Sequence, residues 1–422
     1  MLHLLLGRSG TGKTSEIYRR IAQSVAKGKP VVLLVPEQFS FESERALCAL
    51  LGEREALSVQ VLSFTRLCHK IFYRYGKVAG NYIDRPAKYL LMSLAVAQVQ
   101  EELSVYRTQA ARTSFVPVAL DMVGEFKNAG ASPDDVLCAG RESENERLGR
   151  KLSEIGLIYQ AYQAIVERSF CDPADDISRA IGLCRGRGFF VGSDVYIDSF
   201  TAFMAPEFQM IEQIMAECDE LTVTACCDTL YDETGGSGLF SSANETLRRL
   251  MAAARRAGCP VASPEYLSQQ HRAQSGSLRH LEREYLRGGA RFTGAQQEVC
   301  AIACGDIYDE IETVARQIAD LTLERGYRYR EIALIARDLS SYSDIILDTF
   351  ARYRIPVSYT HLSFKNIKII ERDLGSDPNN PRKTLDPGHT GQGVDKVIET
   401  VSYTHLDVYK GQPYASSWPF SI

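Results

Sequence analysis

The sequence lacks several features that mark whole classes of protein. Its 11 cysteines include no CxxC pair and no matching Cys/His pair, so the pattern predicts neither a zinc site nor a disulfide framework. No apolar run approaches the roughly 20 residues of a membrane span. The apolar stretch at the amino terminus ends at Gly7, which is too short for a signal peptide. We therefore expect a reduced, cytoplasmic protein without membrane contact.

A surplus of positive charge is also missing. The chain has 48 Lys and Arg against 53 Asp and Glu, a net charge of -5. Binding to nucleic acid would therefore need local basic surface or backbone amides in a groove. The 422 residues are 45% hydrophobic and 24% charged, which is typical of a globular protein with two or three domains.

The sequence does contain a phosphate-loop motif near its start. The stretch GRSGTGKT fits the pattern GxxxxGK[ST], with an apolar strand at 2–6 before it and a helical pattern at 13–27 after it. Backbone amides of such a loop turn towards phosphate groups, the lysine reaches the β and γ phosphates, and the threonine binds magnesium. The expected nucleotide-binding residues are Gly7, Arg8, Ser9, Gly10, Thr11, Gly12, Lys13 and Thr14.

A second acid is expected on a neighbouring strand. In VYIDSF, Asp198 follows an apolar strand, where it would hold magnesium through water; the alternative is an aspartate that caps the next helix. The following residue is Ser199, where fast ATPases usually carry a glutamate. A missing general base costs on the order of 10²- to 10⁴-fold in rate. We expect ATP and magnesium binding with slow or no hydrolysis, with Glu207 as an alternative base.

The order of apolar patterns predicts an α/β fold with a parallel, RecA-like phosphate-loop sheet. Residues 1–83 and 191–263 form the phosphate-loop domain, and 84–190 an all-helical insertion. Residues 264–292 are interpreted as a solvated connector, with a basic DNA-facing role as the alternative, and 293–356 as the start of a second α/β domain.

The end of the chain does not fit this architecture. The hexapeptide VSYTHL occurs at 357–362 and again at 401–406, but the flanking residues do not match, so it is not a structural repeat. VSYTHLDVYK looks like translated adapter sequence. We expect 357–422 to be non-native or, alternatively, a disordered polar tail, and in neither case to carry chemistry.

Six stretches in this order and spacing resemble the amino-terminal third of the AddB family, the second subunits of bacterial AddAB helicase-nucleases. They are GRSGTGKT, LLVPEQFSFESERAL, VQVLSFTRLCHKIF, KLSEIGLIYQAYQ, VYIDSFTAF and EIALIARD. The likeness covers residues 1–356. AddB proteins in turn are similar to superfamily 1 helicases of the UvrD type in which several motifs have decayed, so the resemblance implies an inserted helical subdomain resembling the 1B subdomain of those helicases.

The resemblance also implies contacts for the nucleotide and for single-stranded DNA. Arg337 falls near the nucleotide, and the implied DNA-binding residues are Gln38, Phe39, Phe41, Ser63, Phe64 and Arg66. Exposed aromatic rings stack on unpaired bases with roughly 1–3 kcal/mol each. The alternatives are that Phe64 fills the gap between sheet and helices, and that Arg66, His69 and Lys70 form a solvated helix face.

Function follows from the same resemblance. It implies an enzyme subunit that works with AddA, the active motor and nuclease, on duplex ends and on single-stranded DNA, which it scans for the Chi sequence. The nuclease and the 4Fe-4S cluster of the family lie beyond the matched region, so we expect no catalytic or iron–sulfur residue here. The alternatives are a free-standing P-loop ATPase or small-molecule kinase, and a scaffold with a vestigial site.

Overall fold

A computed structural model describes 1–76, 80–230, 238–285, 289, 291–295, 298–336, 339, 341–357 and the backbone of 367–370. The chain divides into two compact units, Met1–Gln269 and Gln270–Ile422, and each is treated by itself. No helix in the described part is long and apolar enough to cross a membrane.

The first unit is built on a six-stranded sheet in the order β3-β2-β4-β5-β1-β6. Every neighbouring pair is parallel, which confirms the predicted α/β fold with a parallel sheet. The strands are β1 (Leu2–Gly7), β2 (Val31–Leu34), β3 (Val59–Leu62), β4 (Asp194–Ile197), β5 (Glu220–Cys226) and β6 (Glu265–Leu267). Because β1, β5 and β4 are parallel neighbours, their carboxyl ends lie together at one edge of the sheet.

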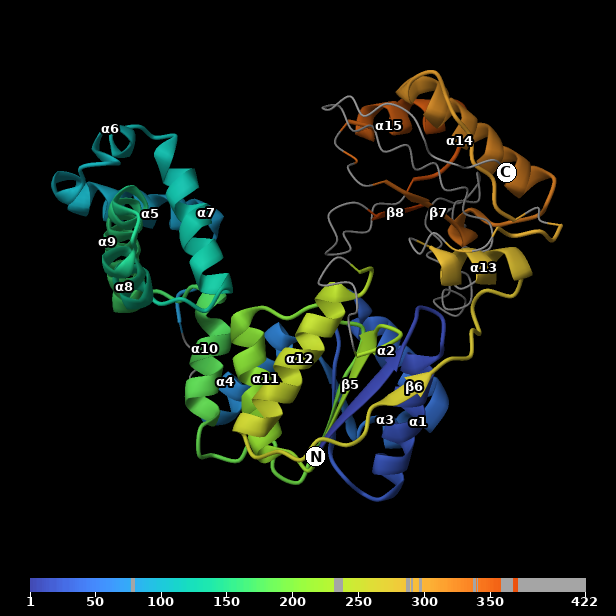
Figure 1. Cartoon of the computed structure of the whole chain (residues 1–422), viewed down its shortest axis with the longest axis horizontal. Helices are drawn as coiled ribbons and strands as arrows, with labels where there is room; N and C mark the ends of the chain where they lie inside the picture. Colours follow the sequence, from blue (N-terminus) through green and yellow to red (C-terminus); the bar gives the residue numbers. More distant parts are fainter. Residues whose placement is uncertain are drawn as a thin grey trace, which may run out of the picture. The chain divides into compact units, whose positions relative to one another are not determined.

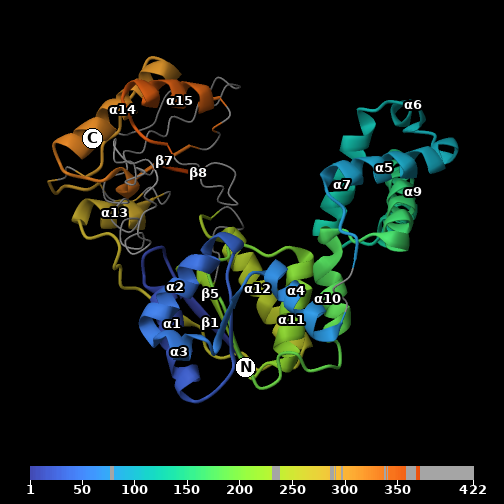
Figure 2. The same cartoon turned by 180° about the vertical axis from the view of Figure 1, so that it is seen from behind.

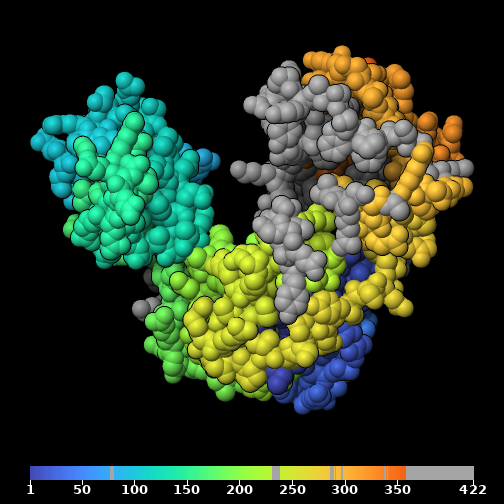
Figure 3. Space-filling model, in the orientation of Figure 1, coloured from blue at the N-terminus to red at the C-terminus, as the bar shows by residue number. Residues whose placement is uncertain are grey.

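Helices cover both faces of this sheet (Figure 1). On one face lie α1 (Lys13–Ala26), α2 (Ser40–Leu51) and α3 (Glu53–Ala56), with η1 (Glu37–Phe39) before them. On the other face lie α4 (Phe64–Tyr75), α10 (Asp176–Cys184), α11 (Ala205–Glu217) and α12 (Ser241–Arg256). Strands β2 and β4 are buried along their whole length, as strands covered on both faces must be. Helix α12, yellow-green, forms part of the surface seen in Figure 3.

Between β3 and β4 the chain forms a separate group of helices. These are α5 (Arg85–Val99), η2 (Gln100–Glu102), α6 (Arg107–Ala110), α7 (Phe115–Asn128), α8 (Pro133–Glu142) and α9 (Glu146–Ser169), and they share their own apolar core. Local signals start three of them: Asp84 caps α5, Ser132 and Asp135 form a capping box at α8, and Asn145 caps α9. The chain enters and leaves this group through a parallel bridge between Tyr82 and Cys171.

Two segments differ from the expected domain plan. Helix α10, with η3 (Pro173–Asp175) before it, was expected within the helical insertion but packs its Ala180 and Ile181 into the core beneath the sheet. Periodicity places an apolar face on a helix but does not say which core that face joins. The expected connector 264–292 contains β6 and α13 (Gly276–Glu284). A three-residue edge strand is held by backbone pairing and needs no apolar run.

The second unit contains α14 (Ile307–Leu323), η4 (Tyr329–Glu331), β7 (Ile332–Ile335), α15 (Ser343–Arg352) and β8 (Ile367–Ile370). Strands β7 and β8 pair antiparallel. A small apolar core includes Ile311, Ile318 and Phe350. Strand β8 falls in the tail for which no element was expected; the remainder of 358–422 and Arg337 lie outside the described residues.

Candidate nucleotide-binding site

The phosphate loop joins β1 to α1 at the carboxyl edge of the sheet. Gly10 and Gly12 have φ angles of 80° and 83°, in the left-handed region that favours glycine. A Cβ on Gly7 would lie 2.7 Å from the carbonyl oxygen of Leu267 in β6. The three glycines therefore allow a close-packed loop whose backbone approaches a ligand at the amino terminus of α1.

Lys13 lies across the start of this loop. Its Nζ donates to the carbonyl oxygens of Gly7 at 2.7 Å and Arg8 at 2.9 Å. The Thr11 hydroxyl, which is buried, also donates to the Arg8 carbonyl, at 2.9 Å. The ammonium group is thus held beside the first turn of α1, where the helix dipole favours bound anions.

Thr14 and Asp198 come together although 184 positions separate them in the chain. The Thr14 hydroxyl donates to Asp198 Oδ2 at 2.7 Å, and Asp198 is only 3% exposed. The other carboxylate oxygen, Oδ1, accepts from the Thr224 hydroxyl of β5 at 2.5 Å. The Ser199 hydroxyl lies 3.3 Å from Oδ2. The two expected magnesium ligands therefore meet, and a third residue orients the carboxylate.

The alternative role of Asp198 as a helix cap does not match these contacts. Helix α11 begins at Ala205, and its amino terminus is closed by Glu207, whose Oε2 accepts from the Met204 amide at 2.8 Å. Burial raises the pKa of Glu207, and the Met204 amide opposes this effect. Glu207 therefore caps the amino terminus of α11. Ser199 is exposed and has a φ of 66°.

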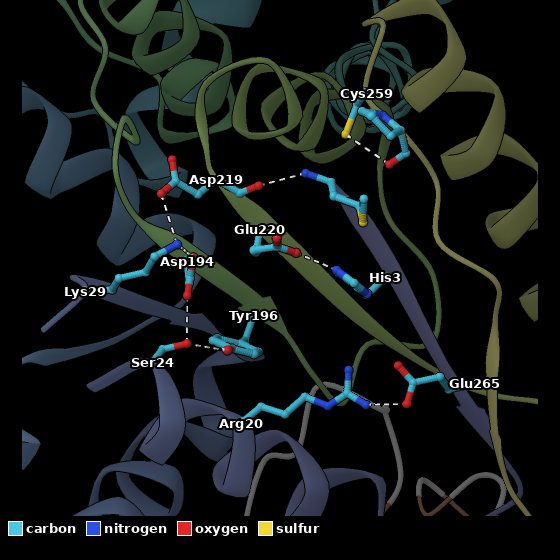
Figure 4. Close-up of polar contacts among 12 residues, drawn as sticks. His3, Arg20, Ser24, Lys29, Asp194, Tyr196, Asp219, Glu220, Cys259 and Glu265 are labelled. Atoms are coloured by element: carbon cyan, nitrogen blue, oxygen red, sulfur yellow. Dashed lines mark hydrogen bonds and ion pairs between the residues drawn. The ribbon is translucent and has the colours of Figure 1, made fainter. Parts of the chain in front are cut away.

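Helix α1 is tied at both ends to β4 or to the residue that follows it, and Figure 4 shows the contacts at the far end. At the far end, the Ser24 hydroxyl donates to Asp194 Oδ2 at 2.7 Å and lies 2.9 Å from the Tyr196 hydroxyl. Lys29 Nζ binds Asp194 and Asp219, at 3.0 Å each. Residues 194, 196 and 198 share one face of the strand, because successive side chains alternate. The whole helix–strand contact therefore sets the position of Thr14 relative to the Asp198 carboxylate.

Three residues at this edge carried no sequence signal. Besides Thr224, they are Asp228 and Phe240, which both contact Arg8 of the loop. Arg8 Nη1 lies 3.2 Å from Asp228 Oδ2, and the Arg8 guanidinium stands 5.2 Å from the centre of the Phe240 ring. No motif contains these residues; they join the site because β5 is the strand between β1 and β4.

Magnesium and ATP fit the chemistry of this donor set. Oxygen ligands are those that magnesium prefers, and it commonly takes one or two from the protein and the rest from phosphates and water. Thr14 and Asp198 supply such oxygens beside a loop of backbone amides. Among the described residues, no group of three or more His, Cys, Asp or Glu side chains could hold a metal ion by itself.

The residues implied for DNA contact have different environments. Phe41 is 71% exposed at the start of α2, whereas Gln38 and Phe39 are half-buried. Ser63 caps α4 by accepting the Arg66 amide at 3.2 Å, and its hydroxyl donates to Glu37. Arg66 forms an exposed ion pair with Glu44 at 2.9 Å. Phe41 and Arg66 are accessible, and Ser63 has a structural role.

Phe64 requires a correction. Its ring is 5% exposed and packs edge-to-face against Phe200 at 5.4 Å and Phe203 at 6.3 Å. It cannot stack on a base in this position, so the expectation that it binds DNA is wrong. The alternative, that it fills the gap between sheet and helices, describes its contacts. An aromatic residue after a strand has the same sequence pattern in either role.

Known proteins resemble this chain over most of its length. Residues 4–282 match the family model described as "ADDB, N-terminal". A protein of Acetivibrio thermocellus, named as the second subunit of an "ATP-dependent helicase/deoxyribonuclease", is 30% identical over 364 residues, covering 84% of this chain and 32% of that protein. Proteins of the same name from Clostridium acetobutylicum and Clostridium tetani are each 28% identical, over 362 and 366 residues. Each match covers 84% of this chain and about a third of the relative, 31% and 32% respectively.

Proposed function

Because this chain belongs to the AddB family, whose amino-terminal domain it contains, we propose that it is part of a helicase-nuclease subunit that binds ATP and magnesium at its phosphate loop. The proposed whole protein acts in the cytoplasm with AddA on DNA ends, and this part binds the single strand that is scanned for Chi. The name shared by its relatives, which describes one subunit of an ATP-dependent helicase and deoxyribonuclease, supports this role.

The contact between Thr14 and Asp198, at 2.7 Å, carries the nucleotide part of the proposal. Amides of residues 8–14 and the Lys13 ammonium would hold the phosphates. Thr14 would bind magnesium directly and Asp198 through water. When bound, the ion neutralises phosphate charge. Position 199 is a serine, and Glu207 is engaged at the start of α11, so neither of the two positions considered for a general base supplies a free carboxylate, which supports weak or absent hydrolysis.

Nucleotide binding is tested by titrating the 422-residue chain with a fluorescent ATP analogue and magnesium. Lys13→Ala is expected to weaken binding about 10- to 100-fold, because charged hydrogen bonds contribute about 1.5–3 kcal/mol. Lys27→Ala is the matched control, because this exposed lysine follows the other end of α1. Equal affinities for Lys13→Ala and the parent chain would refute the loop assignment.

Hydrolysis separates this proposal from a free-standing ATPase or kinase. We expect phosphate release from the same chain to be far slower than the roughly 10 s⁻¹ of a typical enzyme. Turnover near that rate without DNA would favour the free-standing enzyme. Single-stranded DNA should bind weakly and more weakly as salt rises.

A further inference from the structure

A basic surface lies at the end of α4 that is far from Ser63 and Arg66. The exposed Arg74 and Arg187 stack on two aromatic rings: Arg74 stands 5.3 Å from the centre of the Phe189 ring, and Arg187 4.9 Å from that of Tyr75. The two rings meet edge-to-face at 6.2 Å. Lys70 lies one turn before Arg74, and Arg185 two residues before Arg187. We call Lys70, Arg74, Arg185 and Arg187 the basic stack.

The basic stack lies at the opposite edge of the sheet from the phosphate loop. Helices α4 and α10 pack side by side (Figure 2). Phe189 precedes β4 by five residues, and the amide of its neighbour Phe190 donates at 3.1 Å to Glu217, which closes α11 just before β5. Since β4 and β5 start here, this is the amino-terminal edge. No residue of the nucleotide site takes part.

The four cations of the basic stack are not paired with any carboxylate that the structure describes. Within the described part of the chain, none of the four forms an ion pair, and α4 contains no acidic residue. The nearby carboxylate of Glu217 is engaged by the Phe190 amide and by Gln213 Nε2 at 2.6 Å. Burial and the adjacent charge of Arg74 lower the pKa of Lys70. This surface is therefore electropositive on a chain whose net charge is -5.

The chemistry of this surface suits phosphates more than bases. Arginine presents a planar fork of donors that matches phosphate oxygens, and stacking on a ring holds that fork in place. A guanidinium group lies over one face of the Tyr75 ring and one face of the Phe189 ring, and Phe189 is only 9% exposed, so these rings are poorly placed to stack on a base. A surface of donors with few acceptors fits a polyanion whose bases are turned inward.

We propose that the basic stack is a docking surface for the phosphate backbone of duplex DNA, separate from the loops at the carboxyl edge that were expected to contact a single strand. Tyr73, 82% exposed on the same helix, borders it and can donate its hydroxyl to a phosphate. Because binding is through phosphates alone, it is independent of sequence and sensitive to salt.

The test uses the whole 422-residue chain and a labelled blunt-ended duplex, with affinity measured by fluorescence anisotropy between about 50 and 200 mM salt. The variant Arg74→Gln, Arg185→Gln, Arg187→Gln should lower the slope of log affinity against log salt by about 2 to 3, because each phosphate contact contributes about 0.9. At low salt its affinity should fall about tenfold or more. The matched control is Arg107→Gln, Arg112→Gln, Arg168→Gln, three exposed arginines of the helical insertion, which should keep the parent slope.

Two further measurements keep the result decisive. Magnesium-dependent nucleotide binding, at the opposite edge, should be unchanged in the triple variant, which also reports on folding. If the triple variant does not fold, the single variant Arg185→Glu replaces it in the test. The Arg185 side chain is exposed and has no contact in the described structure, so the variant should fold. It should weaken duplex binding several-fold. Replacing Tyr73 with Phe should weaken duplex binding and leave single-strand binding unchanged if its hydroxyl contacts a phosphate of the duplex.

The proposal is overturned if the parent chain does not bind duplex, or if both triple variants lose affinity equally. It is also overturned if the basic-stack variant binds duplex normally but no longer associates with an acidic partner protein, because the surface would then be a protein interface. None of these results bears on the nucleotide site, so the two proposals fail separately.

Discussion

Asp198 is oriented by three hydroxyl groups, two of them from other elements, before any ligand is considered. Thr14 belongs to α1, Thr224 to β5, and Ser199 follows Asp198 in the chain. A carboxylate held on both oxygens has little rotational freedom, so its binding geometry is set in advance. In the proposed magnesium site, Thr224 would act through Asp198, as a positioning residue.

Thr224→Val should weaken magnesium-dependent nucleotide binding about 3- to 10-fold, because a lost hydrogen bond contributes about 0.5–1.5 kcal/mol. Binding measured without magnesium should hardly change. Thr222→Val is the matched control, since Thr222 is also buried, in the same strand and on the same face. An equal loss in both variants would show a general effect on the strand instead.

Phe64 is buried and Phe41 is exposed, so replacing each of them should have opposite effects on stability and on DNA binding. Phe64→Ala should lower the free energy of unfolding by about 3–5 kcal/mol, the range for a buried phenylalanine. Phe41→Ala should leave stability nearly unchanged, because its ring is 71% exposed, and should weaken single-stranded DNA binding by about 1–3 kcal/mol. Denaturant titration and DNA anisotropy check both; normal DNA binding by Phe41→Ala would remove it from the DNA surface.

At the scale of the elements, helix α9 contains an acidic residue, Glu154, that holds the loop at residues 104–106 in place. The buried Glu154 accepts from the Ser104 hydroxyl at 2.6 Å and amide at 2.9 Å, and from the amides of Val105 and Tyr106 at 2.8 and 2.9 Å. Burial alone would raise the pKa of Glu154, but these hydrogen bonds outweigh it and lower the pKa below the ordinary 4.5. The ionised form therefore stabilises the helical insertion.

Glu154→Gln should destabilise the insertion by about 2 kcal/mol at neutral pH, in the range for hydrogen bonds to a charged group. Since the folded-state pKa is lowered, the stabilising contribution is complete above pH 4.5 and is lost as the pH falls below it. The variant should lack this part of the acid sensitivity. Denaturant midpoints at neutral and acidic pH measure both effects; an unchanged acid profile would contradict the assignment.

At the scale of the whole molecule, the two units have cores of very different size. Among the residues that the structure describes, the first unit contains three apolar clusters, on both faces of the sheet and among the inserted helices, whereas the second contains one small cluster. Stability follows buried apolar area, so the second unit should open first.

Hydrogen exchange should therefore show stronger protection in β1, β2 and β4 than in α14 and α15. Nucleotide with magnesium should raise the unfolding midpoint of the first unit by mass action and leave the second unchanged. One cooperative transition for the full chain, shifted as a whole by nucleotide, would show that the units do not unfold independently.

The sequence by itself determined the phosphate loop, the parallel α/β class and the helical character of the insertion. Each rests on neighbours in the chain: glycine spacing, uninterrupted apolar runs and helical periodicity. Only the tertiary structure decided which residues meet. Thr224 reaches Asp198 because Val223 pairs with Ile197 in the ladder between β5 and β4. Strand order likewise brings Asp228 to Arg8, and packing buries Phe64 and assigns α10 to the sheet. Such contacts depend on register and on which faces cover each other, and no local pattern encodes them.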